Sequence, residues 1–285
     1  MGRPKARRGV RVALFSVLLT LCILCLLLWV ALIVSDANIK PYSPTEEKAD
    51  IETILRQESL SEEDYSLLYC QTGLTKIGID RALEHGEQGI QRVLDIQRQY
   101  FTEHEVEHDN FAPLMCTDFL ADGKHVRNIY LEEGDILITS STHFSAFRMG
   151  HAGIVTDADR GEVLQAAAYG QMSRIGRASE FTDRVSFMIL RPKAGTATGR
   201  TVAKYARENL SGIPYNAFAG IFSDKNSVNT TQCAHLVWYA YHTAAGIDLT
   251  DKTIILPYGL ANSDELEVVQ VFGFDPDTLW SDLFY

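Results

Sequence analysis

The sequence predicts an α+β protein that carries an apolar helix near its N-terminus, and three observations lead to this fold class. Residues 12–34 contain no charged side chain, residues 51–119 space their apolar positions mainly as a helix does, and strand-like runs begin near Gly134. Such a change of hydrophobic period indicates helices followed by strands. The expected segments are a basic tail (1–11), a transmembrane signal-anchor (12–34), a linker (35–50), a small helical subdomain (51–130) and an α+β domain (131–285).

The run from Val12 to Val34 predicts a helix that spans a membrane. At about 1.5 Å per residue, its 23 residues match the roughly 30 Å hydrocarbon core of a bilayer. The first twelve residues carry a charge of +5, so the rest of the chain carries −16 within a total of −11. The basic flank should stay in the cytoplasm and the acidic part should lie outside it. The acidic balance also excludes nucleic acid as the main partner.

A cleaved signal peptide is the alternative to this anchor. Ser35 and Ala37 suit cleavage after Ala37, which would release a secreted protein. The apolar run is longer than the usual ~7–15 residues of a signal peptide. We therefore favour an uncleaved, single-pass anchor with a cytoplasmic N-terminus and an extracytoplasmic C-terminal domain.

The cysteines leave one thiol without an obvious structural role. Cys22 and Cys25 lie in the apolar run, and Cys70, Cys116 and Cys233 follow it. A disulfide between Cys70 and Cys116 is one interpretation, and two buried thiols are the other. Under the first interpretation Cys233 is the odd thiol of an exported protein.

The predicted sheet consists of short runs rich in branched apolar residues, with turn residues between them. These runs are "GDILIT", "GHAGIVTD", "EVLQAAAYG" and "VSFMILRP". Helices are expected again at residues 201–210 and from about Thr231 to Ala245, where Gly246 provides a stop.

The run "HEVEH", from His104 to His108, fits the motif of zinc peptidases. On a helix, the motif presents two histidines one turn apart, with Glu105 as a general base. Here Glu103, Glu107 and Asp109 would crowd such a site with uncompensated charge. We interpret the run as a solvated, acidic helix end and predict no metal there.

The run "TTQCAHLVWYAY", residues 230–241, predicts a buried helix with Cys233 in its first turn. The candidate N-cap residues are Asn229, Thr230 and Thr231. The N–H groups and the dipole at this end favour a thiolate, and the same N–H groups can stabilise an oxyanion. Cys233 is therefore a candidate nucleophile, with a structural core cysteine as the alternative. His235 points nearly the opposite way on the helix, so its base must come from elsewhere.

His151 is the best candidate for that base. Strand alternation places His151 and Gly153 on one face. If the following turn centres near Ala158, Gln165 falls opposite His151 on the next strand, within contact distance. Gln165 would then accept a hydrogen bond from the imidazole and fix its tautomer.

These residues resemble those of the NlpC-type papain-like cell-wall peptidases. "GIPY" (Gly212–Tyr215) and "QCAHLVWYAYHTAAGIDL" are similar to the segments around the nucleophile of that family, and "GHAGIV" is similar to its histidine hairpin. Because the histidine precedes the cysteine, the chain resembles the circularly permuted branch, called YiiX-like or YycO-like and related to lecithin retinol acyltransferase. "GDILIT" and "LPYGLANSDEL" also fit that branch. The resemblance covers about residues 134–272.

The resemblance implies a permuted papain-like domain whose antiparallel sheet packs on the helix that bears the nucleophile. It implies Cys233 as nucleophile, His151 as base and Gln165 in the orienting position, where the permuted branch often has glutamate. Tyr215 and Gln232 are expected in the substrate and oxyanion region.

The function that this implies is a membrane-anchored cysteine hydrolase that cleaves amide bonds in peptidoglycan stem peptides, with no metal or other cofactor. The alternatives are a hydrolase or acyltransferase for lipid or acyl-ester substrates and a non-catalytic binding module at the cell surface. We interpret His143 as a loop histidine, His235 as a packed helix residue and Arg148 as a solvated arginine.

Overall fold

The computed structural model describes residues 4–37, 42–112, 115–121, 128–144, 148–220, 224–252 and 254–274. The chain forms two compact units, Met1–Ile39 and Lys40–Tyr285. Each unit is described by itself.

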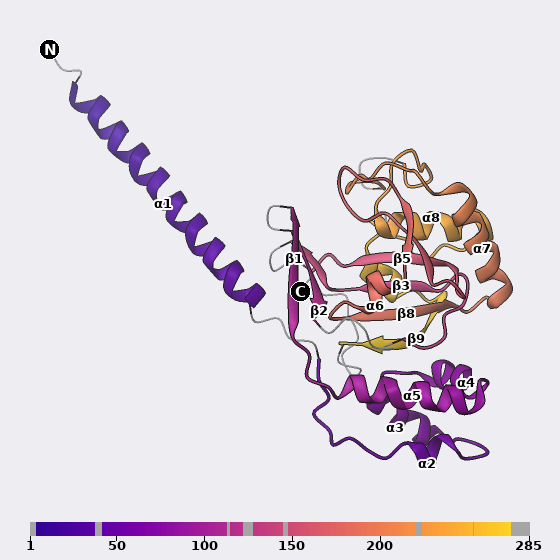
Figure 1. Cartoon of the computed structure of the whole chain (residues 1–285). Coiled ribbons are helices and arrows are strands. Elements are labelled where there is room, and N and C mark those ends of the chain that lie inside the picture. Colours follow the sequence, from indigo (N-terminus) through magenta and orange to yellow (C-terminus); the bar gives the residue numbers. More distant parts are fainter. Residues whose placement is uncertain are drawn as a thin grey trace. The chain divides into compact units, whose positions relative to one another are not determined.

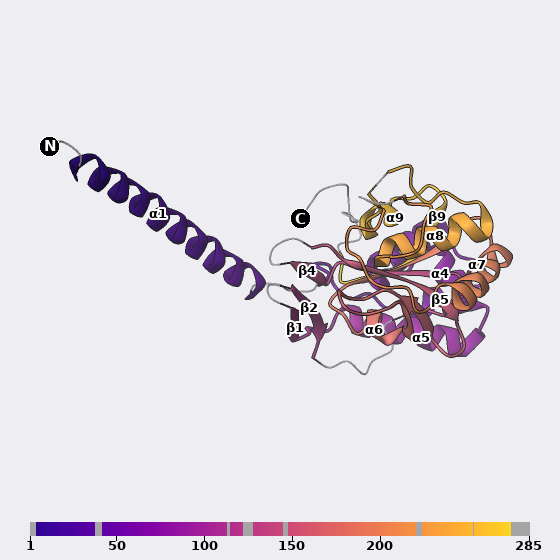
Figure 2. The ribbon, with the colours of Figure 1, turned by 90° about the horizontal axis from the view of Figure 1, so that it is seen from above.

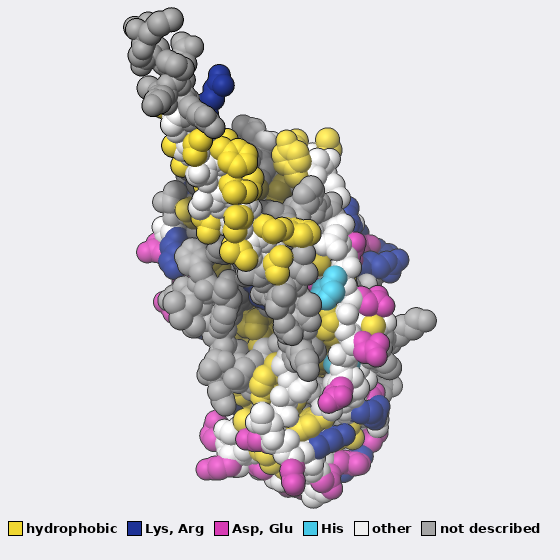
Figure 3. All heavy atoms as spheres, turned by 90° about the vertical axis from the view of Figure 1, so that its left-hand side faces the viewer, with side chains coloured by type: hydrophobic (Ala, Val, Ile, Leu, Met, Phe, Trp, Pro, Cys, Tyr) yellow, Lys and Arg dark blue, Asp and Glu magenta, His cyan; other side chains and the backbone are white. Residues whose placement is uncertain are grey.

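The first unit is the helix α1 (Pro4–Ala37). Its segment Gly9–Val30 has a mean hydropathy of 2.8 and none of its residues is buried. Figure 3 shows the hydrophobic side chains that gather on this helix. Among the described residues, α1 is the one helix long and apolar enough to cross a membrane, and most of the predicted segment 12–34 lies within Gly9–Val30.

The second unit begins with four helices, α2 (Glu52–Leu55), α3 (Glu62–Thr72), α4 (Lys76–Leu83) and α5 (Gly86–Tyr100). Ser61 caps α3, because its hydroxyl accepts from the Asp64 N–H while the Asp64 carboxylate accepts from the Ser61 N–H. Gly73 ends α3 with a φ of 70°, and a Cβ there would lie 2.0 Å from the carbonyl oxygen of Val271. Glycine therefore allows α3 to approach a strand of the sheet.

The helical pattern predicted up to Phe119 is wrong beyond Tyr100. Residues that follow form a three-stranded antiparallel sheet in the order β1 (Val106–Ala112), β2 (Met115–Leu120) and β4 (Thr142–Phe144). The pairing of β2 with β4, about 25 residues away, is a non-local contact that local apolar spacing does not report.

A six-stranded antiparallel sheet forms the centre of the unit, in the order β7-β6-β5-β3-β8-β9. Its strands are β3 (Ile136–Thr139), β5 (His151–Asp157), β6 (Glu162–Gln165), β7 (Arg174–Arg177), β8 (Phe187–Pro192) and β9 (Leu266–Phe272). The predicted α+β class with antiparallel strands is therefore confirmed.

Helices cover both faces of this sheet (Figures 1 and 2). On one face, Ile136, Ile138 and Ile154 share a core with α7 (Thr196–Asn209), α8 (Cys233–Ala245) and α9 (Pro257–Ala261). On the other face, Leu137 and Val155 share a core with α2 to α5 and with Phe181 on the short helix α6 (Ser179–Thr182). The alternation of neighbouring residues between two cores explains why these strands are apolar throughout.

The helical segment and the sheet thus belong to one compact unit, Lys40–Tyr285. Helix α8 ends as predicted, because Gly246 adopts a left-handed conformation with a φ of 69°.

Candidate functional site

Cys233 is the first residue of α8, and Gln232 is its N-cap. The side-chain oxygen of Gln232 accepts a hydrogen bond of 2.8 Å from the Ala234 N–H. The predicted caps Asn229, Thr230 and Thr231 are therefore wrong by one to three residues. Because the helix starts later than expected, Cys233 lies directly at its positive end. The cysteine is 8% exposed and belongs to the core between α8 and the sheet.

His151 begins β5 and is hydrogen-bonded to Gln165, with 2.7 Å between its Nε2 and the Oε1 of Gln165. The register differs from the predicted one, since Gln165 lies opposite Gly153 and an irregularity follows Val155. The two side chains still meet because His151 and Gly153 lie on the same face, so Gln165 reaches its diagonal neighbour. The imidazole stacks on Phe181, with 5.1 Å between ring centres.

Glu180 extends this arrangement and was missed by the sequence analysis. Its Oε2 accepts a hydrogen bond of 2.8 Å from the Gln165 amide nitrogen, and it forms an ion pair of 2.7 Å with Arg174. Because the amide nitrogen faces Glu180, the amide oxygen faces His151. Nε2 of His151 therefore carries the proton, and Nδ1 carries the lone pair that a general base needs.

Burial works to raise the pKa of Glu180, but the guanidinium of Arg174 and the N–H of Arg177 outweigh it and hold that pKa below its usual range. The carboxylate is therefore charged at neutral pH and keeps Gln165 in its orientation.

Arg184 is a buried cation near both candidate residues, and it too was missed. Its Nε donates to the carbonyl oxygen of Glu180 at 2.6 Å, and its Nη1 donates to the hydroxyl of Thr142 at 2.7 Å. Burial lowers the pKa of Arg184 to about 10, so it stays protonated at neutral pH. Its charge acts to lower the pKa values of both His151 and Cys233.

The resting site holds a neutral imidazole and a neutral thiol. Burial, followed by the charge of Arg184, lowers the pKa of His151 to about 3. Burial raises the pKa of Cys233, although the N–H groups of Ala152 and Ala234 partly offset this. The pair therefore cannot rest as a thiolate and an imidazolium, and any activation of the thiol must occur during the reaction.

Cys233 and His151 approach the same end of β5 from opposite faces of the sheet. The N–H of Ala152, the residue after His151, favours the Cys233 thiolate and so links the two positions. Within the part of the chain that the structure describes, no hydrogen bond joins the two side chains. Proton transfer between them requires a side-chain movement, as in catalytic pairs that tighten only when substrate binds.

Tyr215 lies beside the start of α8, because it forms a parallel bridge with Thr231. Burial raises the pKa of Tyr215, and the proximity of the Cys233 sulfur raises it further. The amide nitrogen of Gln232 donates to the carbonyl oxygen of Ile255 at 2.6 Å. Gln232 therefore acts as a helix cap and does not direct this donor at an oxyanion beside Cys233.

Other predicted candidates have different surroundings. His235 is buried, with its ring nitrogens bonded to the Thr231 hydroxyl and to the Lys225 carbonyl. His143 is a buried strand residue rather than a loop histidine, and Arg148 is not a solvated arginine, because both contact Asp118.

The HEVEH run is not helical: its last three residues belong to β1, and His104 contacts the carbonyl oxygen of Gln99. The solvated helix end predicted for this run is therefore wrong. All five cysteines are present as thiols, so the interpretation of a disulfide between Cys70 and Cys116 is wrong.

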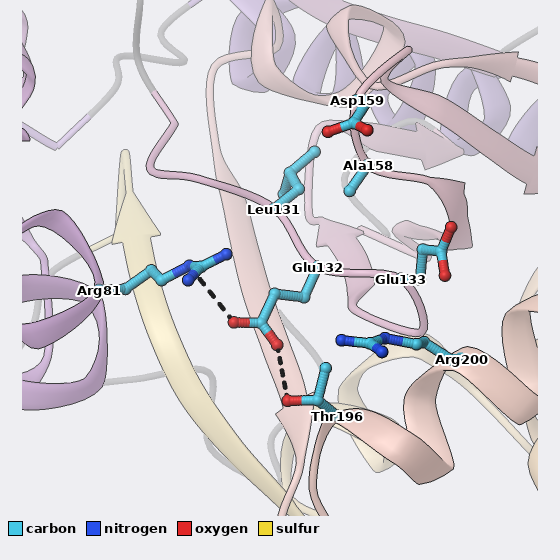
Figure 4. Close-up of a pocket in the computed structure, with 8 residues that line it drawn as sticks. All are labelled: Arg81, Leu131, Glu132, Glu133, Ala158, Asp159, Thr196 and Arg200. Carbon is cyan, nitrogen blue, oxygen red and sulfur yellow. Dashed lines mark hydrogen bonds and ion pairs between the residues drawn. The ribbon is translucent and has the colours of Figure 1, made fainter. Parts of the chain in front are cut away.

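A surface pocket of about 380 Å³ lies away from these residues (Figure 4). Glu132 is at its centre, within 3.4 Å of Arg81 and 3.1 Å of the Thr196 hydroxyl. The pocket is lined mainly by charged side chains of both signs and by no thiol or histidine, so it is not a candidate for nucleophilic catalysis.

No protein-family model matches the chain, and no curated protein is similar enough to count as a match. A solved structure, that of metalloprotein yiiX from Escherichia coli O157:H7, is 14% identical, with a match that covers 49% of this chain and 97% of that one at a TM-score of 0.40. At this TM-score, the likeness does not establish a shared fold family or activity.

Proposed function

We propose that the protein is a membrane-anchored, extracytoplasmic thiol hydrolase with a permuted papain-like domain. In this proposal Cys233 is the nucleophile, His151 the general base and Gln165 the residue that orients the base. The observation that carries it is the chain of hydrogen bonds from His151 through Gln165 to Glu180, which leaves the lone pair on Nδ1. A buried histidine that is held in one tautomer near a first-turn cysteine supports nucleophilic catalysis.

The reaction starts from the neutral thiol and imidazole. A side-chain movement must first bring the imidazole to the thiol. Nδ1 of His151 then takes the thiol proton as Sγ of Cys233 attacks the carbonyl carbon, and the charge of Arg184 favours the thiolate. The N–H of Cys233 stabilises the oxyanion, because the Ala234 N–H already binds Gln232. The imidazolium then protonates the leaving group, and water hydrolyses the acyl-enzyme with His151 again as base.

An amide of a cell-wall peptide is the first substrate class. The membrane anchor would hold the domain outside the cytoplasm, next to the wall, if the basic tail remains inside. The Cys233 N–H at the start of α8 suits a planar amide, whose carbonyl oxygen needs a donor there.

A lipid or acyl-ester substrate is the second candidate, favoured by exposed apolar residues near the site. Met149 is 41% exposed and lies two residues before His151, and Phe218 is 57% exposed and lies three residues after Tyr215. Met172, 59% exposed, is bridged to Pro214, which precedes Tyr215. Exposed apolar side chains around a site are typical of surfaces that bind acyl chains or membranes.

The proposal is tested with the full chain in detergent. Purified cell wall and lipid vesicles are incubated separately with wild type, and released products and acylation of the Cys233 peptide are followed by mass spectrometry. We expect one substrate to give both product and a transient acyl-enzyme, and Cys233→Ala and His151→Ala to abolish both. Cys70→Ser is the matched control, because it removes a thiol on α3 and should leave turnover unchanged.

Each outcome separates one alternative. Product from wall alone supports the amidase, and product from vesicles alone supports the acyl hydrolase. Failure of both substrates to acylate Cys233, with retention of binding to either, would identify a non-catalytic binding module. Turnover that survives Cys233→Ala would show that the nucleophile is wrong.

A further inference from the structure

The three-stranded sheet gathers four side chains that can bind a metal on one of its faces. Cys116 and Asp118 are two residues apart on β2, so both point to the same side. His108 on β1 lies opposite Asp118, and His143 on β4 lies opposite Cys116. Figure 2 shows these three strands side by side. Strand pairing therefore brings together a thiol, a carboxylate and two imidazoles from three separate segments.

Three of these ligand atoms are close enough to surround one ion, and the fourth side chain contacts one of the three. Nδ1 of His108, Sγ of Cys116 and a carboxylate oxygen of Asp118 lie within 4.8 Å of one another. Nδ1 of His108 is 2.8 Å and Nε2 of His143 is 3.0 Å from the same oxygen, Oδ1 of Asp118. Arg148 contacts the other oxygen, Oδ2, at 3.3 Å, which leaves Oδ1 directed at the two histidines.

We propose that His108, Cys116 and Asp118 bind Zn²⁺, with His143 beside Oδ1 as the fourth ligand. A set of one thiolate, imidazoles and one carboxylate is typical of tetrahedral zinc, whereas magnesium and calcium prefer oxygen ligands alone. Asp118 and His143 are fully buried and Cys116 is 5% exposed, but the His108 side chain is 36% exposed. His108 therefore lies at the entrance by which the ion reaches the site.

A bound ion would tie β1, β2 and β4 together, and this has a consequence for the candidate active site. The hydroxyl of Thr142 on β4 contacts the Thr117 hydroxyl on β2 at 3.3 Å, and it also accepts the hydrogen bond from Arg184. The zinc site would thereby fix the strand that positions Arg184. The ion itself has no part in the proposed hydrolysis, so the two proposals can fail independently.

The test measures zinc bound by the full chain in detergent, after removal of metal with a chelator and addition of Zn²⁺ against a competing chromophoric chelator. We expect one equivalent of zinc in wild type, a rise in the thermal unfolding midpoint on binding, and at least tenfold weaker binding in His108→Ala. His104→Ala is the matched control, since His104, the other histidine of the HEVEH run, contacts the Gln99 carbonyl instead.

Cobalt(II) substitution identifies the sulfur ligand. The thiolate-to-cobalt absorption band should be lost in Cys116→Ser and kept in Cys233→Ser. Absence of stoichiometric zinc in wild type, equal affinity of His108→Ala and wild type, or loss of the band in Cys233→Ser rather than Cys116→Ser would each overturn the site. Because the His108 side chain lies at the surface, His108→Ala should fold. It therefore still tests the zinc site if Cys116→Ser does not fold.

Discussion

The protein has two histidine clusters that differ in how the chain assembles them. His151 and Gln165 meet across a hairpin whose strands follow one another directly. His108, Asp118 and His143 meet across three strands, the last of which is supplied by a segment about 25 residues further along. In the first cluster, burial lowers the pKa of His151 and the charge of Arg184 lowers it further. The second cluster holds its histidines around a carboxylate. The first keeps a neutral imidazole with a lone pair on Nδ1, whereas the second suits a cation.

The difference teaches which contacts a sequence can reveal. A hairpin is a local structure, so an apolar alternation and a turn were enough to place His151 and Gln165 on one face. The turn centre was misjudged, yet the pair survived because a shift of two residues keeps a side chain on the same face. A non-local strand pair has no such local pattern, and the histidines of the HEVEH run were therefore assigned to a helix.

Replacement of Cys233 or of Cys116 by serine has the largest expected effect. The two variants test most directly whether the two clusters have separate roles. Cys233→Ser should lower the hydrolysis rate by about 10³-fold or more, because serine lacks the acidity of a thiol, and should leave the zinc content unchanged. Cys116→Ser should lower the zinc affinity and keep most of the hydrolysis rate. The measurements are initial rates and bound zinc on the same preparations. An equal loss of hydrolysis in both variants would show that the two clusters act as one site, which contradicts the separate roles proposed here.

The fold was predicted as far as local patterns reach. The α+β class and the C-terminal end of α8 follow from apolar spacing and from the glycine after the helix. The β1–β2 hairpin was missed because its acidic residues resemble a solvated helix end, and strand pairing outweighs such weak propensities. Glu180 lies on α6 and Arg184 just after it, and both were missed because no spacing rule relates this helix to a hairpin.

Acid should destabilise the first cluster through His151. Its pKa in the folded protein, about 3, lies below the unfolded value of about 6.5, so the unfolded state binds the extra proton between these values. The contribution to stability is present above pH 6.5 and is lost as the pH falls toward 3. Between pH 7 and 5, the loss should be about 2 kcal/mol, since 1.5 pKa units lie in that interval.

Urea unfolding of wild type and His151→Gln at pH 7 and pH 5 measures this loss. The variant has no titrating group at this position, so its stability should fall by about 2 kcal/mol less than that of wild type over the same interval. An equal pH dependence in both proteins would show that His151 is not buried as a neutral group.

Glu180→Gln tests whether the outer carboxylate orients the base. A neutral amide at position 180 can no longer hold Gln165 in one orientation, so the imidazole loses its fixed tautomer. We expect kcat to fall about tenfold with little change in KM, as is typical for residues that orient a functional side chain from behind. Glu162→Gln is the matched control, because Glu162 lines the same pocket as Glu180 but forms its ion pair with Arg207. A similar loss in both variants would assign the effect to surface charge.

The smallest effect is expected from Arg184→Met, and it distinguishes a local charge from mere burial. Removal of this cation should raise the pKa of both Cys233 and His151, because the charge lowers both. The pH dependence of Cys233 alkylation by iodoacetamide in the full chain gives the thiol midpoint directly. Arg184→Lys keeps the charge and should leave that midpoint near the wild-type value. An unchanged midpoint in Arg184→Met would show that the charge of Arg184 does not affect the acidity of the thiol. Arg184 would then have no electrostatic role at Cys233 in the proposed mechanism.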